Sequence, residues 1–256
     1  MKKSLVYSIV LVLIFSLSMF YVGGRVEEIN LTSPTNVSWT ASQTPTFSYL
    51  VAGNESTYTC DLIVNDVFMG QNVSAANDTA IYILANDTIT PAINLTWYVN
   101  CSDGIEINQS PLFLITIDGV APTSNLVVTD NNTWTTDTTP IISFNVTDNL
   151  DSLINYSIIV DGTVVNWTSV ANNTPVTYTF ETPLSEAAHN IVVEAMDNGG
   201  NRTNSSVLLL YVDNTAPMVA VNNTWNNTWS KVNTSLQINF NFSDNLDSVI
   251  NYSVII

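Results

Sequence analysis

The stretch TDNLDSLINYSIIV at residues 147–160 occurs a second time, as SDNLDSVINYSVII, at residues 243–256. The motifs that precede the two copies repeat as well, as IDGVAP at 117–122 and VDNTAP at 212–217. Each pair is separated by about 95 residues, which is the length of a domain and too long for one unit of a solenoid. The chain is therefore expected to be a tandem array of related domains.

Short segments of alternating apolar and polar residues fill these repeats, and helical periodicity is absent after residue 24. The pairs Asn65-Asp66 and Asp161-Gly162 separate such segments at corresponding positions and predict two-residue hairpin turns. This pattern predicts an all-β fold of tandem immunoglobulin-like β-sandwiches. Strands are expected at 46–51, 58–64, 80–84, 94–100 and 112–117, at 125–128, 141–146, 154–160, 163–167, 176–180, 190–195 and 206–212, and at 218–221, 235–242 and 250–256.

The predicted domains are 25–118, 119–214 and 215–256, after a hydrophobic helix at 1–24. The third contains only the first half of a sandwich, because it stops one residue before the expected hairpin turn. We expect it to be a fragment of a longer cell-surface protein. The alternative is an assembly device, completed by a strand from a neighbouring subunit.

The N-terminal segment combines Lys2 and Lys3 with an apolar run from Ser4 to Val22. Its length is sufficient to span a bilayer, and no small-residue cleavage pattern follows it. A cleaved signal peptide and an uncleaved membrane anchor both fit. Either one places the remaining chain outside the cell, because the positive charges stay in the cytoplasm.

The charge balance is strongly acidic, with 5 Lys and Arg residues against 22 Asp and Glu residues and a formal net charge of -17. Nucleic acids and anionic membrane surfaces both require basic patches, so neither is an expected partner. Membrane contact is expected only through the N-terminal segment. The expected partners are other cell-surface proteins or glycans, or further copies of the chain itself.

Two features agree with export. Cys60 and Cys101 align with Tyr156 and Ala195 of the next repeat, on strands expected to be neighbours, and predict a disulfide. About twenty Asn-x-Ser/Thr sequons follow residue 25, although an Asn- and Thr-rich chain makes some by chance. The candidate glycosylation sites are Asn30, Asn54, Asn94, Asn131, Asn166, Asn201 and Asn226.

The second domain closes with the pattern His189-x-Ile191-x-Val193-x-Ala195-x-Asp197-Asn198-Gly199-Gly200-Asn201. This ending resembles that of prokaryotic immunoglobulin-like repeats, and the high Asn and Thr content looks archaeal. The resemblance covers 119–256 well and the first domain less well. It implies a surface or adhesin-type protein, since such repeats serve as stalks, adhesive modules and enzyme appendages.

Acidic residues gather where one end of an immunoglobulin-like sandwich is expected. Hard oxygen ligands at a domain junction suit Ca²⁺, so no cofactor is predicted except calcium as the one candidate. The alternative is that Asp and Asn occur there only as good turn residues. The candidate calcium ligands are Asp118, Asp148, Asp151 and Asp197 around the second domain, and Asp213, Asp244 and Asp247 in the third copy.

No enzyme activity is predicted. His189 is the only histidine, and the resemblance implies that it packs against or hydrogen-bonds a corner of the fold. Trp39, Trp134 and Trp229 each follow a sequon. Their rings bind sugars of a ligand, cover the edge of the first strand, or contact the first sugar of a glycan on the same domain. The predicted function is a glycosylated, adhesive stalk. The alternatives are a surface-layer or filament subunit assembling by strand donation, and the non-catalytic stalk of an exported hydrolase.

Overall fold

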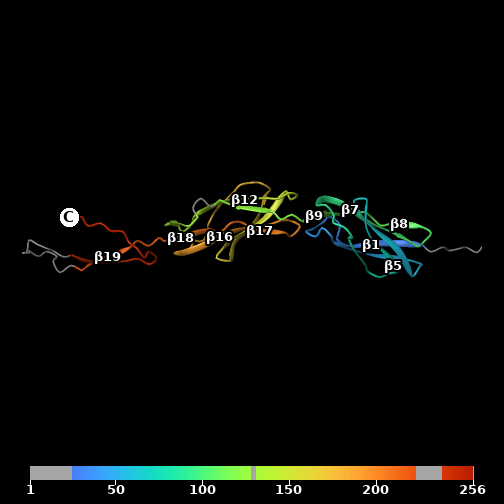
Figure 1. Ribbon diagram of the computed structural model, residues 1–256, viewed down its shortest axis with the longest axis horizontal. Coiled ribbons are helices and arrows are strands. Elements are labelled where there is room, and N and C mark those ends of the chain that lie inside the picture. Colours follow the sequence, from blue (N-terminus) through green and yellow to red (C-terminus); the bar gives the residue numbers. More distant parts are fainter. Residues whose placement is uncertain (1–24, 128–130, 223–237, 256) are drawn as a thin grey trace, which may run out of the picture. The chain divides into compact units, whose positions relative to one another are not determined.

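The computed structural model describes residues 25–127, 131–222 and 238–255. The chain forms two compact units, Met1–Gly119 and Val120–Ile256, each with its own sheets (Figure 1). Within the described ranges, no helix has the length and apolar character needed to cross a bilayer. The predicted signal peptide or anchor at 1–24 lies outside them.

Unit 1 is a sandwich of two sheets, and the chain changes sheet between β1 and β2. Short strand β2 therefore joins the edge of the second sheet, where it runs parallel to β9. The first sheet has the order β1 (Val26–Ser33), β3 (Thr46–Gly53), β6 (Ile81–Leu84). The second has the order β2 (Ser38–Thr40), β9 (Phe113–Ile117), β7 (Ala92–Ser102), β4 (Thr57–Val64), β5 (Val67–Ala76), and β8 (Ile107–Gln109) pairs with β7.

Unit 2 contains a second sandwich with the same strand order, as the repeats predict. Again the chain changes sheet after its first strand, and β11 runs parallel to β18. One sheet has the order β10 (Thr123–Leu126), β12 (Ile141–Thr147), β15 (Val176–Thr179). The other has the order β11 (Thr133–Thr135), β18 (Leu208–Val212), β16 (Ala187–Met196), β13 (Leu153–Val160), β14 (Thr163–Ala171), and β17 (Arg202–Asn204) pairs with β16.

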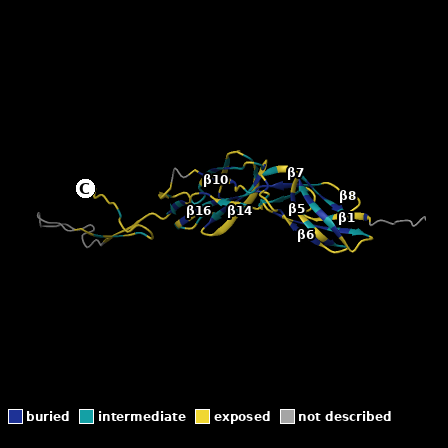
Figure 2. Cartoon of the chain, turned by 45° about the vertical axis from the view of Figure 1, so that its right-hand side comes forward, coloured by how far each residue is buried: buried dark blue, intermediate teal, exposed yellow. Residues whose placement is uncertain are grey.

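Each sandwich has its core between the two sheets, and Figure 2 shows these buried residues in dark blue. In β4 the alternation is complete: Tyr58, Cys60, Leu62 and Val64 are buried, and the residues between them are more exposed. A strand whose side chains alternate between faces buries every second residue when one face is covered. The alternation visible in the sequence is therefore the pattern of core contacts.

The two predicted hairpin turns are present between β4 and β5 and between β13 and β14. Asn65 and Asp66 have φ values of 49° and 62°, and Asp161 and Gly162 have 50° and 81°. Positive φ at both central residues matches the twist of the flanking strands, which explains the Asn, Asp and Gly found there.

Cys60 and Cys101 form the predicted disulfide, with a Cα–Cα distance of 4.1 Å. They are directly paired on β4 and β7, so the bond joins neighbouring strands of one sheet. Tyr156 and Ala195 are paired in the same way in the second sandwich. The alignment of the repeats thus identified the correct strand pair.

The third copy forms an antiparallel pair, β19 (Met218–Asn222) and β20 (Asn239–Ser243). The strand predicted at 250–256 is wrong for residues 250–255, which form no strand. Its counterpart β13 is held by β14 and β16 on its two sides, and no counterparts of these occur among the described residues. A strand-like pattern becomes a strand only when its backbone groups find partners.

Candidate functional site

Three carboxylates come together inside unit 2. One oxygen each of Asp213, Asp244 and Asp247 lies within 4.8 Å of the others. Asp213 follows β18, and the other two belong to the turn after β20. These are the three residues that the sequence predicts as calcium ligands in the third copy.

The turn after β20 is organised by Asp244. Its Oδ1 accepts hydrogen bonds from the backbone nitrogens of Asp247 (2.9 Å) and Leu246 (3.0 Å). These two hydrogen bonds lower the pKa of the Asp244 carboxyl, because they favour its charged form. Its Oδ2 is shielded from solvent and has no hydrogen-bond partner among the described residues. Thus one oxygen maintains the turn, and the other remains available to a ligand.

Glu186, just before β16, connects the two segments that supply these carboxylates. It accepts hydrogen bonds from the Thr215 hydroxyl at 2.7 Å and from the Asn245 side-chain amide. The residue after Asp213 also donates its backbone N–H to Glu186. The end of the second sandwich and the β19–β20 pair are thereby held together at this point.

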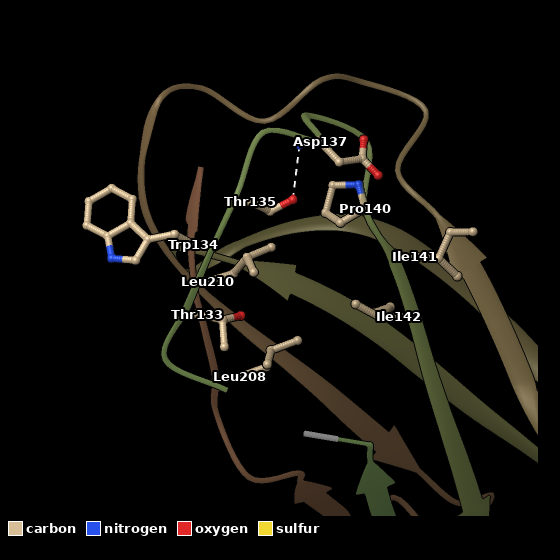
Figure 3. A pocket seen from close by; sticks show the side chains of 9 residues that line it. All are labelled: Thr133, Trp134, Thr135, Asp137, Pro140, Ile141, Ile142, Leu208 and Leu210. Carbon is tan, nitrogen blue, oxygen red and sulfur yellow. Dashed lines mark hydrogen bonds between the residues drawn. The ribbon is translucent and has the colours of Figure 1, made fainter. Parts of the chain in front are cut away.

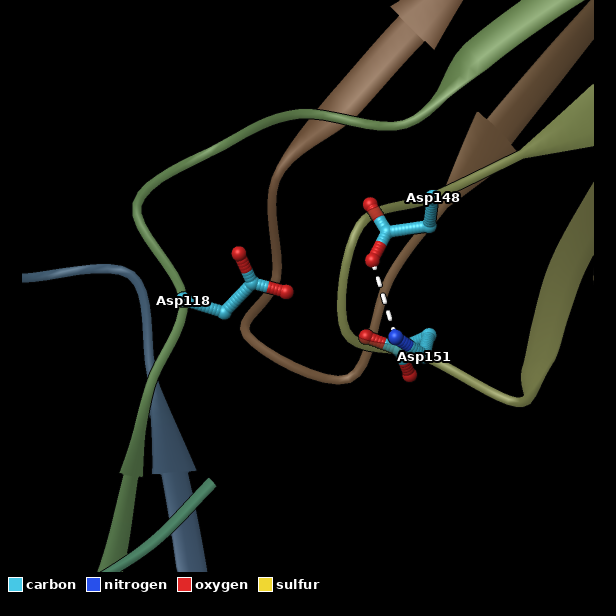
Figure 4. A group of neighbouring side chains, drawn as sticks. All are labelled: Asp118, Asp148 and Asp151. Atoms are coloured by element: carbon cyan, nitrogen blue, oxygen red, sulfur yellow. Dashed lines mark hydrogen bonds between the residues drawn. The ribbon is translucent and has the colours of Figure 1, made fainter. Parts of the chain in front are cut away.

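The corresponding loop of the second sandwich, between β12 and β13, has the same turn. Asp148 Oδ1 accepts from the backbone nitrogens of Leu150 (2.8 Å) and Asp151 (2.9 Å), the second of which is dashed in Figure 4. Asp148 Oδ2, like that of Asp244, is shielded from solvent and has no hydrogen-bond partner in the part of the chain that the structure describes. Asp118, drawn in the same figure, is a buried residue of unit 1 whose backbone nitrogen donates to Thr40 O at 2.9 Å.

Asn172 is a site residue that sequence reasoning missed. Its Nδ2 donates to the backbone carbonyls of Asp148 and Asp151, both at 2.7 Å, and its Oδ1 accepts from the Asp148 nitrogen at 3.2 Å. The side chain thus closes the β12–β13 loop from the far end of β14. The sequence gives no signal for this role, because Asn172 lies in a sequon within a turn-like Asn-Asn pair.

Asp197, another predicted calcium ligand, has a different role. Its Oδ1 accepts from the Asn201 backbone nitrogen at 2.8 Å, and its Oδ2 accepts from the Asn201 side-chain amide at 2.7 Å. Both oxygens therefore close the loop between β16 and β17. The carboxylate clusters of the structure do not include Asp197.

The carboxylates of unit 2 have few protein cations to neutralise them. Arg25 and Arg202 are the only Lys or Arg residues in the described ranges. Arg202 Nη1 contacts Glu194 at 2.5 Å. Asp213, Asp244 and Asp247 supply the hard oxygen ligands that Ca²⁺ or Mg²⁺ prefers. A divalent cation is the chemistry that this arrangement can accommodate.

His189 joins the β13–β14 hairpin to the start of β16. Its Nδ1 lies 2.7 Å from Asp161 Oδ2, and its Nε2 lies 2.9 Å from the Ser185 carbonyl oxygen. Both partners are acceptors, so a ring nitrogen that carries a hydrogen can donate it to the partner on its side. The Ser185 hydroxyl is farther away, at 3.4 Å, and Nε2 is already used by the carbonyl. The contact is that of a structural corner, as predicted for this residue.

The predicted glycosylation sites differ in what their side chains do. Asn30 and Asn94 are exposed on β1 and β7, whereas Asn166 is half-buried on β14. Asn54 accepts a hydrogen bond from the Arg25 nitrogen, Asn131 accepts one from Leu209, and Asn201 donates to Asp197. Asn226 and Trp229 lie outside the described residues.

A cavity of about 420 Å³ opens between the two sheets of the second sandwich (Figure 3). It is lined by Leu208, Leu210 and Ile142, with threonine hydroxyls and Asp137 at its rim. Asp137 accepts a hydrogen bond from the Thr139 nitrogen at 2.8 Å and so stabilises the turn in which it lies. An opening of about 470 Å³ occurs at the corresponding place in unit 1. Both lie where the chain changes sheet, and neither presents a set of catalytic groups.

Residues 102–214 match the family described as "Bacterial Ig-like domain". This match covers the second sandwich, and it starts in the last strands of the first sandwich. No curated protein matches the chain.

Among solved structures, fibronectin(III)-like modules of Clostridium thermocellum CbhA are 17% identical over 72% of this chain and 93% of theirs, with a TM-score of 0.42. A marsupial T cell receptor is 9% identical over 76% and 77%, with a TM-score of 0.47. The BSP domain of a biofilm-associated protein is 15% identical over 73% and 30%, with a TM-score of 0.27. Similarities of this size carry no argument about ligand or activity.

Proposed function

We propose that the chain is an extracellular, glycosylated stalk of tandem Ig-like domains, with a structural and adhesive role at the cell surface. The observation that carries this proposal is the repeated sandwich, of which one copy matches the family of bacterial Ig-like domains. A buried disulfide in the first sandwich supports an oxidising compartment. The acidic charge and the abundance of sequons fit a stalk that is exposed at the cell surface.

The test is surface accessibility in the cells that make the protein. An antibody against an epitope inserted in the exposed loop at 104–106 should label intact cells, and added protease should remove the signal. A cytoplasmic protein serves as the control and should remain protected. Labelling only after the cells are lysed would refute the surface assignment.

Calcium is proposed to bind at Asp213, Asp244 and Asp247 and to stiffen the joint between the second sandwich and the β19–β20 pair. Ca²⁺ would offset the mutual repulsion of three carboxylates that have no cationic partner among the described residues. Adding Ca²⁺ to chelator-treated protein should raise the melting temperature of unit 2 and lower its rate of proteolysis near residue 215. Asp244→Asn should abolish both effects, whereas Asp137→Asn should leave them unchanged. An identical melting curve with and without Ca²⁺ would exclude the site.

Strand donation is the second candidate function, and one observation favours it. Phe240, Phe242 and Tyr252 form an aromatic cluster with ring centroids 4.8–5.3 Å apart on the two-stranded β19–β20 sheet. Tyr252 is 61% exposed, so the cluster is only partly covered. Sedimentation of the full chain should then show polymers that Phe242→Ser disperses. If the chain sediments as a monomer at all concentrations, strand donation is rejected and the stalk remains the proposed function.

A further inference from the structure

The same four-residue pattern occurs where the chain changes sheet in both sandwiches. It reads Asn36-Val37-Ser38-Trp39 in unit 1 and Asn131-Asn132-Thr133-Trp134 in unit 2. Each is a sequon followed at once by tryptophan, and each leads into the short edge strand, β2 or β11.

The asparagine of each pattern is held in the same way. Asn36 Oδ1 accepts the backbone N–H of Leu114 at 2.8 Å, and Asn131 Oδ1 accepts that of Leu209 at 2.8 Å. The next residue of each pattern donates a backbone hydrogen bond to the same partner residue. Val37 N donates to Leu114 O at 2.8 Å, and Asn132 N donates to Leu209 O at 2.7 Å. Both asparagines are exposed. The side-chain carbonyl oxygen therefore fixes each asparagine, and its Nδ2 donates no hydrogen bond to the described residues.

The hydroxyl at the third position is not explained by the fold of unit 1. Ser38 Oγ is shielded from solvent and has no hydrogen-bond partner among the described residues. A buried hydroxyl without a partner is unfavourable, and alanine would avoid the cost. The sequon requires a hydroxyl at this position, and that requirement accounts for the serine.

The tryptophan offers a surface beside the asparagine. Trp134 is 54% exposed and stacks on Tyr211, with centroids 4.7 Å apart. Figure 3 shows its ring pointing away from the other side chains that line the cavity. Tyr211 is two residues from Leu209, the partner of Asn131, a distance of about 7 Å along a strand. A sugar attached to Asn131 is thus within reach of the open face of the ring.

Other sequons use their amide nitrogen in the fold. Asn172 donates two hydrogen bonds from Nδ2, and Asn108 and Asn77 donate one each, to the carbonyls of Val26 and Gly53. A glycan replaces one hydrogen of Nδ2, so Asn172 would lose a loop contact on modification. The hydrogen bonds of Nδ2 thus distinguish two kinds of sequon. In one kind the fold uses the amide nitrogen, and in the other the amide nitrogen remains available for a glycan.

We infer that Asn36 and Asn131 carry N-linked glycans, whose first sugars pack against Trp39 and Trp134, and that Asn172 is unmodified. This inference rests on the proposed export of the chain. Nδ2 attacks the anomeric carbon of a lipid-phosphate-linked oligosaccharide, a new C–N bond forms, the C–O bond to phosphate breaks, and Nδ2 loses one proton. Transfer precedes folding of β2, because the Ser38 hydroxyl is buried afterwards. A chain modified at Asn172 would then fold without one of its loop contacts, so the folded protein at the surface is the form that is unmodified there.

Glycopeptide mass spectrometry of the full chain, purified from the cells that make it, tests the inference. Peptides with Asn36 and Asn131 should carry glycan, and the peptide with Asn172 should not. Ser38→Ala and Thr133→Ala should each remove one glycan mass, while the matched Thr133→Ser should keep it. Enzymatic deglycosylation should lower the melting temperature of unit 2 by several degrees, and by less in Trp134→Ala.

Three outcomes overturn the inference. Glycans on other sequons with Asn36 and Asn131 empty would refute these sites and leave the glycosylated stalk intact. Glycan on Asn172 would refute the argument from amide hydrogen bonds. A chain that reaches the surface with no glycan at all would refute both the sites and the proposed glycosylation.

Discussion

The disulfide of unit 1 allows a quantitative prediction. Replacing Cys60 and Cys101 by alanine opens a loop whose ends are 41 residues apart. In the chain-entropy model, a loop of this length corresponds to about 4 kcal/mol of stability. For a domain of about 100 residues, 1 kcal/mol shifts the melting temperature by about 4–8 °C, so the expected decrease is about 15–30 °C.

The second sandwich is an internal control, because Tyr156 and Ala195 occupy the corresponding pair of positions without a covalent bond. Calorimetry of the full chain should show two transitions, of which only that of unit 1 moves. Leu62→Ala, in the unit 1 core, identifies that transition independently. A shift below about 5 °C, or an equal shift of both transitions, would contradict the loop-entropy reasoning.

Three further substitutions test the roles of individual residues. Asn172→Ala should destabilise unit 2 by about 2–4 kcal/mol in urea titrations, since two loop carbonyls lose their donor; a change below about 0.5 kcal/mol would contradict that role. Val37→Asn should stabilise unit 1 by about 1 kcal/mol, because Val37 has a φ of 64° that a β-branched residue adopts with strain; an unchanged midpoint would contradict the strain. Burial raises the pKa of the Asp161 carboxyl, but the Asn190 backbone hydrogen bond and His189 outweigh it, so the pKa lies below its usual value. The stability that Asp161 contributes is therefore present above the ordinary Asp pKa and is lost as the pH falls through the lowered pKa. Asp161→Asn should make the stability of unit 2 less dependent on pH in the acid range. An unchanged pH dependence there would argue against this role of Asp161.

The fold could be predicted from the sequence because its determinants are local. Alternation in β4 and the Asp161-Gly162 pair act within a few residues, through side-chain direction and backbone sterics. The repeats then allowed Cys60 and Cys101 to be placed on paired strands. Residues 250–255 mark the limit of such reasoning, since their pattern suits a strand but the segment pairs with no strand among the described residues.

The candidate sites were predicted only as residue types. Every acidic residue of the calcium prediction looked equivalent in sequence, yet Asp197 uses both oxygens on Asn201 whereas Asp244 keeps one unbonded. Sequons looked equivalent too, yet Asn172 donates from Nδ2 and Asn131 accepts at Oδ1.

The sequence by itself determined the tandem β-sandwiches, their hairpins and the acidic character of the chain. The tertiary structure decided which side-chain atom each polar residue commits to the fold and which it leaves available. The physical reason is distance along the chain: Asn131 meets a backbone group 78 residues away, and Asn172 meets carbonyls 24 and 21 residues away. Hydrogen bonds of this kind exist only after the strands have assembled.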